Sequence, residues 1–515
     1  MDTATSAAEL RAALDFVLAE IAELAGPAGA RHFDDAVAGA GPFGEAIAVQ
    51  HLRNKLVAYL FVKGFPDQPQ VGFKPRMKRE IAILVDRLEN ALLRHFEPAG
   101  PPAPRSFGHD RAARILLVLD HLPARNRIFS HTRQVCTYAG ALALDDGVEA
   151  VRVLVTQETA PENPYHAIRE LGPEDEAGWR GELEEVAGAP APKVQFQTVG
   201  RVGPVRPYRD SIASALAFEP DLVFAFQGIF RSRMIPLLLH PRAAIIAVQM
   251  NQINPEPAFA DLVLAHGHSG DFSEKRTPSK WRNHAVPLIP FPKEIAVDPA
   301  DLGPASPFRI VTVLTLGRLE KGLMRDDAAG LKFVVTFLER HPLAVWLLVA
   351  IEDPEAFAHV IAPHVPATVA ERIRLLPIVP DLRAIYEHCH VYVHLPPLEG
   401  GNMGIAMAVA EGIPVLARKG TDGANTLLPS QAYADAAQAA KSLRRLAASP
   451  ELRSRRLAKQ REKIERDHSL PAATAAFHTF LKDALANFEA RRQAGPPNAG
   501  PEYPGPPGVH GGAMR

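Results

Sequence analysis

The chain has 515 residues, is 47% hydrophobic and carries a formal net charge of −1 at pH 7. This length predicts about three domains with cores of ordinary apolar content, and the near-neutral charge excludes a global basic field that would recruit nucleic acid. The two cysteines, Cys136 and Cys389, exclude a disulfide framework and a cysteine-based zinc site, and they fit the reducing cytoplasm.

The first 105 residues predict a helical region that ends in a linker. Acids among the apolar residues of 1–24 favour an amphipathic helix over a signal peptide. Residues 46–62 and 79–96 carry apolar side chains at helical spacing, and residues 98–105 are proline-rich, as stiff linkers are. No run of about 18 uncharged apolar residues occurs, so we expect no membrane span, although peripheral contact with a membrane stays open.

Residues 106–300 alternate short apolar runs with helical patterns. The strand-like runs are 113–122, 151–157, 193–199, 220–226, 243–250 and 261–267. Helical patterns cover 133–144 and 235–241. Such alternation predicts βαβ units and a parallel sheet. The segment PLIPFPKEI, residues 287–295, is the expected crossing to a further domain.

The same alternation continues over residues 301–485. Strands are expected at 307–316, 344–351, 373–379 and 414–417. Helices are expected at 328–341, in the stretch that ends at Arg372, and at 403–411 after the Glu-Gly-Gly-Asn loop. A short helix followed by a strand is expected within 381–397. These elements predict a second parallel α/β domain.

The loop between His394 and the next helix has the sequence LPPLEGGNMG. A Gly-rich loop of this kind leaves free backbone N–H groups at a helix N-terminus, where the helix dipole favours an anion. Gly400 and Gly401 allow close approach of the backbone to a phosphate. An ordinary strand–turn–helix of an α/β core is the alternative, because Gly-rich loops are common.

Four motifs follow one another in this half of the chain: G-R-L at Gly317, D-L-x-x-x-Y at Asp381, P-x-x-E-G-G at Pro396 and G-I-P-V at Gly412. In this order they resemble the nucleotide-sugar domain of family 4 glycosyltransferases, over roughly residues 306–485. The resemblance implies a GT-B architecture, in which two Rossmann-like domains face each other across a cleft. The expected division is a helical region at 1–105, an acceptor domain at 106–300, a nucleotide-sugar domain at 301–485 and a disordered Pro/Gly-rich tail at 486–515.

The resemblance assigns the donor site residue by residue. Arg318 would neutralise the leaving diphosphate with its forked N–H donors. Lys321 would assist, although it lies three residues after Arg318 where the family has five. Glu399 would take a sugar or ribose hydroxyl, and capping the next helix is the other role open to it. Backbone groups for the diphosphate are expected at Gly317, Gly400, Gly401, Asn402, Met403 and Gly404.

The family's second carboxylate, which holds the donor ribose, is missing at the matching position, where Met407 stands. Glu411 lies one helical turn beyond Met407 and is the first substitute, with Glu399 as the other. On the acceptor side, His131 follows the first predicted strand, and we expect it in a loop. Rossmann-type sites lie beyond the carboxyl ends of strands, so His131 is the candidate contact for the acceptor or the transferred sugar, with a plain polar loop residue as the alternative.

We expect no metal and no cofactor besides the nucleotide-sugar substrate. The chain has no convincing D-x-D motif, and His388, His390 and His394 alternate along a helix-to-strand junction, which spreads them over different faces. Retention of anomeric configuration follows from the resemblance alone. Residues 443–469 predict one charged helix, whose basic side chains serve either a phosphorylated or lipid-linked acceptor or solvent and Glu–Arg pairs. The resemblance implies that the amphipathic helix after it braces the first domain.

Three functions remain open. The first is transfer of a hexose-like sugar from a nucleotide donor to a glycan, lipid or protein, as in polysaccharide biosynthesis. The second is another enzyme on the same scaffold, such as a nucleotide-sugar epimerase or a phosphorylase, although the sequence offers neither the acid/base set nor a pyridoxal lysine for these reactions. The third is a binding or scaffold protein on a degenerate transferase fold.

Overall fold

The structure is a computed structural model of the whole chain. It describes residues 8, 10–21, 23, 48–49, 52–53, 56, 83–85, 87–88, 91, 112–119, 122, 130–156, 176–198, 206–227, 234–249, 259–265, 279–283, 288–289, 297–298, 302, 306–313, 325–351, 353–377, 379, 381–394, 402–419, 424, 427 and 431–494. The predicted linker at 98–105 lies outside these residues. The disordered tail was predicted from residue 486, which is wrong for 486–494, because these residues belong to the helix Leu470–Ala494. The rest of the tail, from residue 495 onward, lies outside the described residues.

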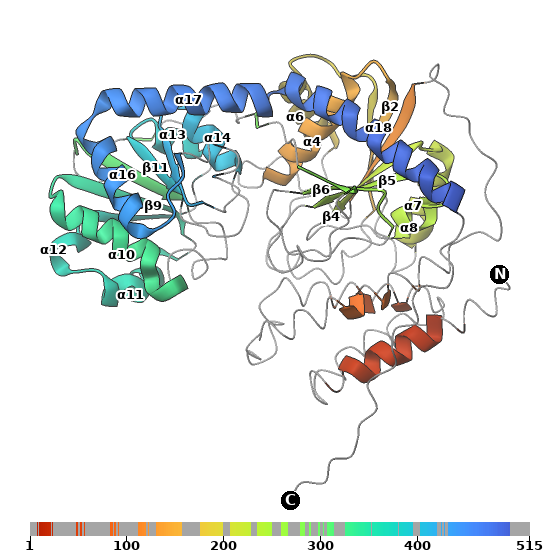
Figure 1. The fold of residues 1–515 in the computed structure, drawn as a ribbon, viewed down its shortest axis with the longest axis horizontal. Helices are drawn as coiled ribbons and strands as arrows, with labels where there is room; N and C mark the ends of the chain where they lie inside the picture. The colour runs from red at the N-terminus through yellow and green to blue at the C-terminus, as the bar shows by residue number, and fades with distance from the viewer. Residues whose placement is uncertain are drawn as a thin grey trace, which may run out of the picture.

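The first sheet contains seven described strands, all parallel, in the order β3-β2-β1-β4-β5-β6-β7 (Figure 1). Their bounds are β1 Ala113–Leu119, β2 Val148–Val155, β3 Val194–Thr198, β4 Leu222–Gln227, β5 Ala244–Gln249, β6 Leu262–Ala265 and β7 Trp281–Asn283. Every residue of β5 is buried, as expected for a parallel strand covered on both faces. Strand β7 is three residues long at the sheet edge, and its sequence gave no strand signal.

Helices cover both faces of this sheet, and the alternation of side chains along each strand separates two cores. Ile115 and Leu117 belong to the core shared with α4 (Ser130–Ala143) and α6 (Glu176–Ala187). Leu116 and Val118 belong to the core shared with α7 (Arg206–Phe218) and α8 (Met234–Leu239). Helices α6 and α7 were not predicted from the sequence.

The N-terminal region is helical where the structure describes it, as predicted: residues 10–21 form a helix, and residues 48–49, 52–53, 83–85 and 87–88 are helical too. Its apolar residues, among them Leu14 and Leu88, are fully or almost fully buried. They belong to the same hydrophobic cluster as Leu116 and Val118 of β1. The region therefore shares the core of the first sheet.

The second sheet contains five described parallel strands in the order β10-β9-β8-β11-β12. The strands are β8 Phe308–Val313, β9 Ala344–Ile351, β10 Ile373–Pro377, β11 Val391–His394 and β12 Val415–Ala417. The helices are α10 Arg325–Arg340, α11 Pro354–Ile361, η4 Ala362–His364, α12 Ala367–Ala370, α13 Leu382–Tyr386, α14 Asn402–Ala410, α16 Ala436–Ala448 and α17 Pro450–His468. The expected strand at 344–351 is confirmed in its bounds, and the helix expected at 328–341 begins three residues earlier.

The prediction of one charged helix over 443–469 is wrong. Helix α16 ends at Ala448, and α17 begins at Pro450. Ser449 separates them in an extended conformation, and its side chain accepts a hydrogen bond from Leu452 N–H. Serine at the N-cap with proline at the first helical position is a helix start signal that breaks the run.

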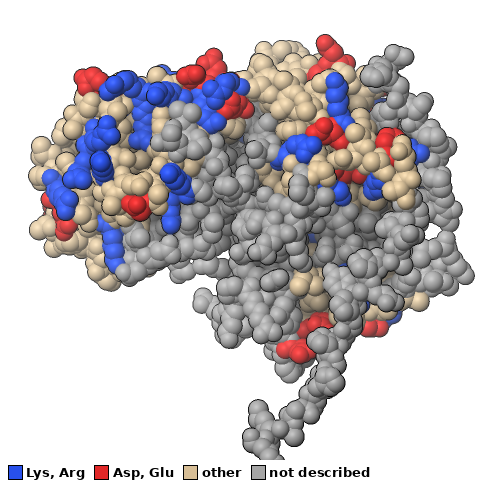
Figure 2. Space-filling view, viewed as in Figure 1, with Lys and Arg blue, Asp and Glu red and all other residues tan. Residues whose placement is uncertain are grey.

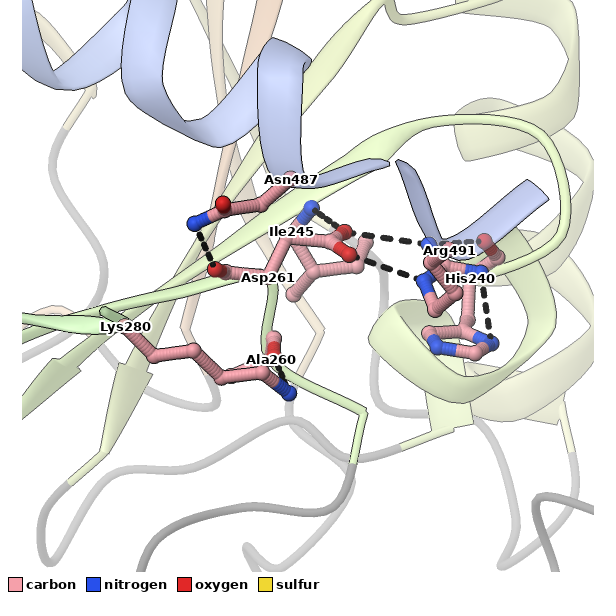
Figure 3. A network of polar contacts seen from close by, with 7 residues as sticks. All are labelled: His240, Ile245, Ala260, Asp261, Lys280, Asn487 and Arg491. Atoms are coloured by element: carbon pink, nitrogen blue, oxygen red, sulfur yellow. Dashed lines mark hydrogen bonds and ion pairs between the residues drawn. The ribbon is translucent and has the colours of Figure 1, made fainter. Parts of the chain in front are cut away.

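The last helix, α18 (Leu470–Ala494), returns to the first sheet, as expected (Figure 1). Phe477 and Phe488 of α18 are buried in the core with α4. Near its end, Arg491 and Asn487 bond to Asp261 in front of β6 (Figure 3). The chain passes between the two sheets once near Leu288 and once near His468. These two segments are in contact, because Leu288 N–H donates to His468 C=O over 2.8 Å. No helix within the described residues is long and apolar enough to cross a membrane.

Candidate functional site

The strand order of the second sheet reverses between β8 and β11. From β8 the chain proceeds to β9 and β10 on one side, whereas β11 and β12 lie on the other. Open parallel sheets bind ligands beyond the carboxyl ends of their strands at such a switch point. Strand β8 ends at Val313 and β11 at His394, so the carboxyl edge at these two residues is the candidate site.

Most of the predicted donor-site residues lie outside the part of the chain that the structure describes. These are Gly317, Arg318, Lys321, Glu399, Gly400 and Gly401. Asn402 and Met403 form the start of α14, with only their backbone described. Gly404 is the third residue of that helix. The roles assigned to all of these residues stay predictions.

Helix α14 starts at Asn402, one residue before the start predicted from the sequence, and so follows the glycines of the Gly-rich loop directly in the chain. It connects two parallel neighbours, β11 and β12, so it runs antiparallel to the strands and its N-terminus lies at their carboxyl edge. The first N–H groups of a helix have no intrahelical partner and carry the positive end of its dipole. The candidate site therefore has an anion-favouring helix end beside it.

The other end of α14 is closed by the backbone and by α17. Gly412 has φ of +89°, a left-handed conformation that favours glycine. The Ile413 N–H donates to Ala408 C=O over 3.0 Å. Arg461 of α17 donates from Nε to Val409 C=O over 3.1 Å, and a cation at this end complements the helix dipole.

A series of buried hydrogen bonds connects the strands at the switch point. The Thr312 hydroxyl of β8 donates to Val393 C=O of β11 over 3.0 Å, and the Trp346 indole N–H of β9 donates to Thr312 Oγ1 over 3.0 Å. Thr312 and Trp346 are fully buried. These bonds fix β8, β9 and β11 to one another just below the carboxyl edge.

Two tyrosines and a histidine lie beneath the first turn of α14. The Tyr386 and Tyr392 hydroxyls are 3.5 Å and 3.7 Å from the place a Cβ would take on Gly404. The Tyr392 hydroxyl also hydrogen-bonds to His394 Nδ1 over 3.3 Å. Burial lowers the pKa of His394 to about 4, so its imidazole is neutral at pH 7. From the sequence, His394 was considered only as a metal ligand. Tyr386 was noted only as the last residue of the D-L-x-x-x-Y motif, and Tyr392 was missed.

The side chain of Met407 is buried among apolar residues, including Ile405 and Val415. Glu411 follows the end of α14, about 10 Å along the helix axis from Gly404. Its carboxylate forms an ion pair with the Arg383 guanidinium. A role for Glu411 at the ribose stays a prediction, and in this arrangement its carboxylate is held at the opposite end of α14 from the Gly-rich loop.

His131 is in the first turn of α4, so its predicted place in a loop is wrong. It still follows β1 at the carboxyl edge of the first sheet, and its side chain lies outside the described part. Two residues on, the buried Arg133 contacts Glu182 and Glu185 of α6 at 2.6 Å and 2.7 Å. It also donates from Nε to Ile289 C=O in the crossing segment over 2.9 Å. Sequence reasoning missed this buried ionic group because an Arg in a helical pattern predicts exposure.

The other histidines of the 388–394 run make separate contacts. His390 Nδ1 accepts the Arg309 N–H over 3.0 Å, and its ring lies against Phe308 with ring centroids 5.5 Å apart. His388 Nε2 lies 3.4 Å from a Glu387 carboxylate oxygen. Each ring is thus engaged with different neighbours.

Lys and Arg side chains gather over the second domain on the side of α16 and α17 (Figure 2). Several of them bond to the protein itself. Arg453 donates to Leu446 C=O over 2.6 Å, and Lys463 pairs with Asp467 at 2.6 Å. These contacts support the structural role of the basic residues, and an acceptor role for the face stays a prediction.

Neither a protein-family model nor a curated protein matches this sequence. Solved structures do match. A mutant O-GlcNAc transferase from Thermobaculum terrenum aligns with a TM-score of 0.56 and 14% identity, over 87% of this chain and 81% of that one. This chain has a GT-B fold. At this identity the likeness shows the fold alone.

Two other solved structures match this chain with lower TM-scores. HepE from Anabaena, solved in complex with UDP, has a TM-score of 0.46 and 13% identity, over 72% of this chain and 99% of that one. Trehalose-6-phosphate synthase OtsA has a TM-score of 0.44 and 14% identity, over the same shares. The predicted GT-B fold class is thus confirmed by the two parallel α/β sheets and by the transferase alignment, whereas the family 4 resemblance stays a prediction.

Proposed function

We propose that this protein is a glycosyltransferase that moves a sugar from a nucleotide-sugar donor to a glycan, lipid or protein acceptor. The observation that carries this proposal is the position of α14. In a GT-B fold, its N-terminus lies at the carboxyl edge of the switch point between β8 and β11, directly after a Gly-rich loop. This arrangement suits the diphosphate of a nucleotide sugar.

The chemistry follows from the charges that the reaction creates. Transfer breaks the anomeric C–O bond through an oxocarbenium-like state, and negative charge develops on the leaving diphosphate. The N–H groups that open α14 would stabilise this charge by oriented dipoles. Arg318, in the segment after β8, would add a guanidinium, with Lys321 as a second cation. Because these groups supply the countercharge, we propose a metal-independent reaction with the nucleotide sugar as substrate.

The other roles predicted from the sequence are also part of this proposal. Glu399 would bind a sugar or ribose hydroxyl, and His131, at the carboxyl edge of the first sheet, would contact the acceptor or the transferred sugar. Retention of configuration and a place in polysaccharide biosynthesis are expectations of the family 4 resemblance. The cytoplasmic setting is proposed from the two cysteines, and peripheral contact with a membrane stays open.

A nucleotide-sugar screen tests the proposal. The purified protein is titrated calorimetrically with UDP-, GDP- and ADP-linked sugars, and bound donors are then incubated with candidate acceptors for product analysis. Arg318→Ala should weaken donor binding roughly 10- to 150-fold, since it removes a charge-assisted contact. Arg374→Ala, at an exposed arginine of β10, is the matched control and should bind normally. Equal binding by both variants would remove Arg318 from the site.

The second candidate is a non-catalytic binding or scaffold protein. Met407 favours it, because the position that should present a ribose-binding carboxylate is an apolar residue buried in the core. The same screen separates the candidates. A transferase binds a donor and forms a glycosylated product, an epimerase converts the donor without any acceptor, and a scaffold protein does neither.

A further inference from the structure

Three polar groups gather under the first turn of α14. Tyr386 comes from the end of α13, and Tyr392 and His394 come from β11. Residues two apart on a strand share a face, so His394 lies one step beyond Tyr392, on the face that α14 covers. The hydroxyls of both tyrosines lie next to Gly404, and the His394 ring is one hydrogen bond away from Tyr392.

Two atoms of this group are buried without a hydrogen-bond partner among the residues that the structure describes. They are the Tyr386 hydroxyl oxygen and His394 Nε2. Both side chains are almost fully buried, with 0% and 2% of the residue surface exposed. Buried polar atoms nearly always have partners in native proteins, and an unsatisfied one indicates strain, a bound water or a ligand.

Both groups are neutral at pH 7. Burial, with smaller contributions from Tyr392 and Cys389, raises the pKa of Tyr386 well above its usual value, so the hydroxyl keeps its proton. Burial lowers the pKa of His394 to about 4. If the Tyr392 hydroxyl donates to His394 Nδ1, the single imidazole proton is on Nε2. The unpartnered atoms are then an O–H and an N–H donor.

We propose that Tyr386 and His394 bind the diphosphate of the donor as uncharged hydrogen-bond donors beside the N-terminus of α14. This inference rests on the proposed function. Two donors next to the positive end of a helix favour an acceptor-rich anion, whereas the carboxylate of Glu411, which would suit a hydroxyl, is held at the opposite end of α14 by Arg383. Gly404 places no side chain between the backbone of α14 and these hydroxyls, because a Cβ there would lie 3.5 Å from the Tyr386 hydroxyl and 3.7 Å from the Tyr392 hydroxyl.

The test measures ligand affinity and stability together. Wild type, Tyr386→Phe and His394→Leu are titrated with UDP, GDP, ADP and inorganic pyrophosphate, and the melting temperature of each protein is recorded without ligand. Tyr386→Phe removes only the unpartnered hydroxyl. It should therefore bind the preferred nucleotide roughly 10-fold more weakly while melting at the same temperature as wild type or higher. His394→Gln, which retains an N–H donor, should recover part of the affinity that His394→Leu loses.

The matched control is Tyr433→Phe. Tyr433 is a buried tyrosine of the same domain whose hydroxyl donates to the His394 carbonyl oxygen over 3.5 Å, so this variant should bind the nucleotide as wild type does. If wild type binds the nucleotide and Tyr386→Phe binds it equally tightly, the inference is overturned and the proposed function is left intact. A lower melting temperature with unchanged affinity would likewise overturn it, in favour of a structural role. Failure of wild type to bind any of the four probes would overturn both.

Discussion

The guanidinium of Arg491 donates hydrogen bonds to both carboxylate oxygens of Asp261, with Nε 2.8 Å from Oδ1 and Nη2 3.0 Å from Oδ2 (Figure 3). Arg491 also donates to the carbonyl oxygen of His240 over 2.9 Å, and Asp261 Oδ2 accepts the N–H of Ile245 in β5 over 2.9 Å. Residues 230 positions apart are thereby joined. The last turns of α18 are thus joined to the first domain.

Breaking this pair should destabilise the first domain. Asp261 is 2% exposed and Arg491 28% exposed, so Arg491→Met leaves a buried carboxylate without its main countercharge. We expect the free energy of unfolding to fall by about 3 kcal/mol, near the lower end for buried pairs because Arg491 is partly solvated. Urea denaturation measures it. Arg492→Met, one residue on, is the control, because its pair with Glu489 is longer, at 3.4 Å; equal losses in both variants would contradict the role of the pair.

Stability should fall in acid through His240, which lies in the same network. Burial, then Arg491 and Lys280, lower the pKa of His240 from 6.5 to about 3. Below pH 6.5 His240 is therefore protonated in the unfolded chain but stays neutral in the folded chain. The free energy of unfolding consequently decreases as pH falls. The expected slope is about 1.4 kcal/mol per pH unit for this residue between roughly pH 6 and 4.

Denaturation curves of wild type and His240→Gln at pH 7.5, 6.5, 5.5 and 4.5 isolate this contribution. The variant should lose less stability than wild type over the acid range, and parallel pH profiles would rule the contribution out. His359→Gln, an exposed histidine of α11, controls for the substitution itself.

Gln460 should stabilise the edge strand β12 as an additional strand would. This fully buried side chain accepts the Val415 N–H over 2.9 Å and donates to the Val415 carbonyl oxygen over 2.8 Å. Gln460→Leu leaves both backbone groups buried and unpaired, so we expect a loss of roughly 2–4 kcal/mol in unfolding free energy. Lys459→Leu, at an exposed position of the same helix, introduces the same side chain and should change stability little; a similar loss there would point to α17 in general.

Met407→Glu should not restore a ribose contact. Met407 is 5% exposed in an apolar cluster, so the new carboxyl group would be desolvated and the variant should lose at least about 2 kcal/mol of stability. We expect donor binding to weaken, because a second carboxylate would repel the carboxylate proposed to bind the ribose, Glu399 or Glu411. Met407→Leu is the control for packing. Tighter binding by Met407→Glu, with no loss in Glu399→Gln and Glu411→Gln, would instead favour the scaffold reading.

The sequence-based prediction of the fold rested on long apolar runs and on the residues that start and end helices. The run AVWLLVAI predicted β9 to the residue, and the Gly-rich loop predicted the start of α14 to within one residue. The prediction was weaker where the local signal was short or mixed. Strand β7 is held by pairing with β6, and the break at Ser449 was hidden inside a basic run.

The amino-acid sequence by itself determined two parallel α/β sheets and a helix that starts next to a Gly-rich loop, because backbone periodicity and glycine conformational freedom are local properties. Tertiary structure alone decided which distant groups meet: Arg491 with Asp261, Gln460 with Val415, and the Tyr386 and Tyr392 hydroxyls with Gly404. These pairings depend on strand order and on the return of α18. Whether a polar side chain is exposed or buried with a partner is set by that packing and not by its neighbours in sequence.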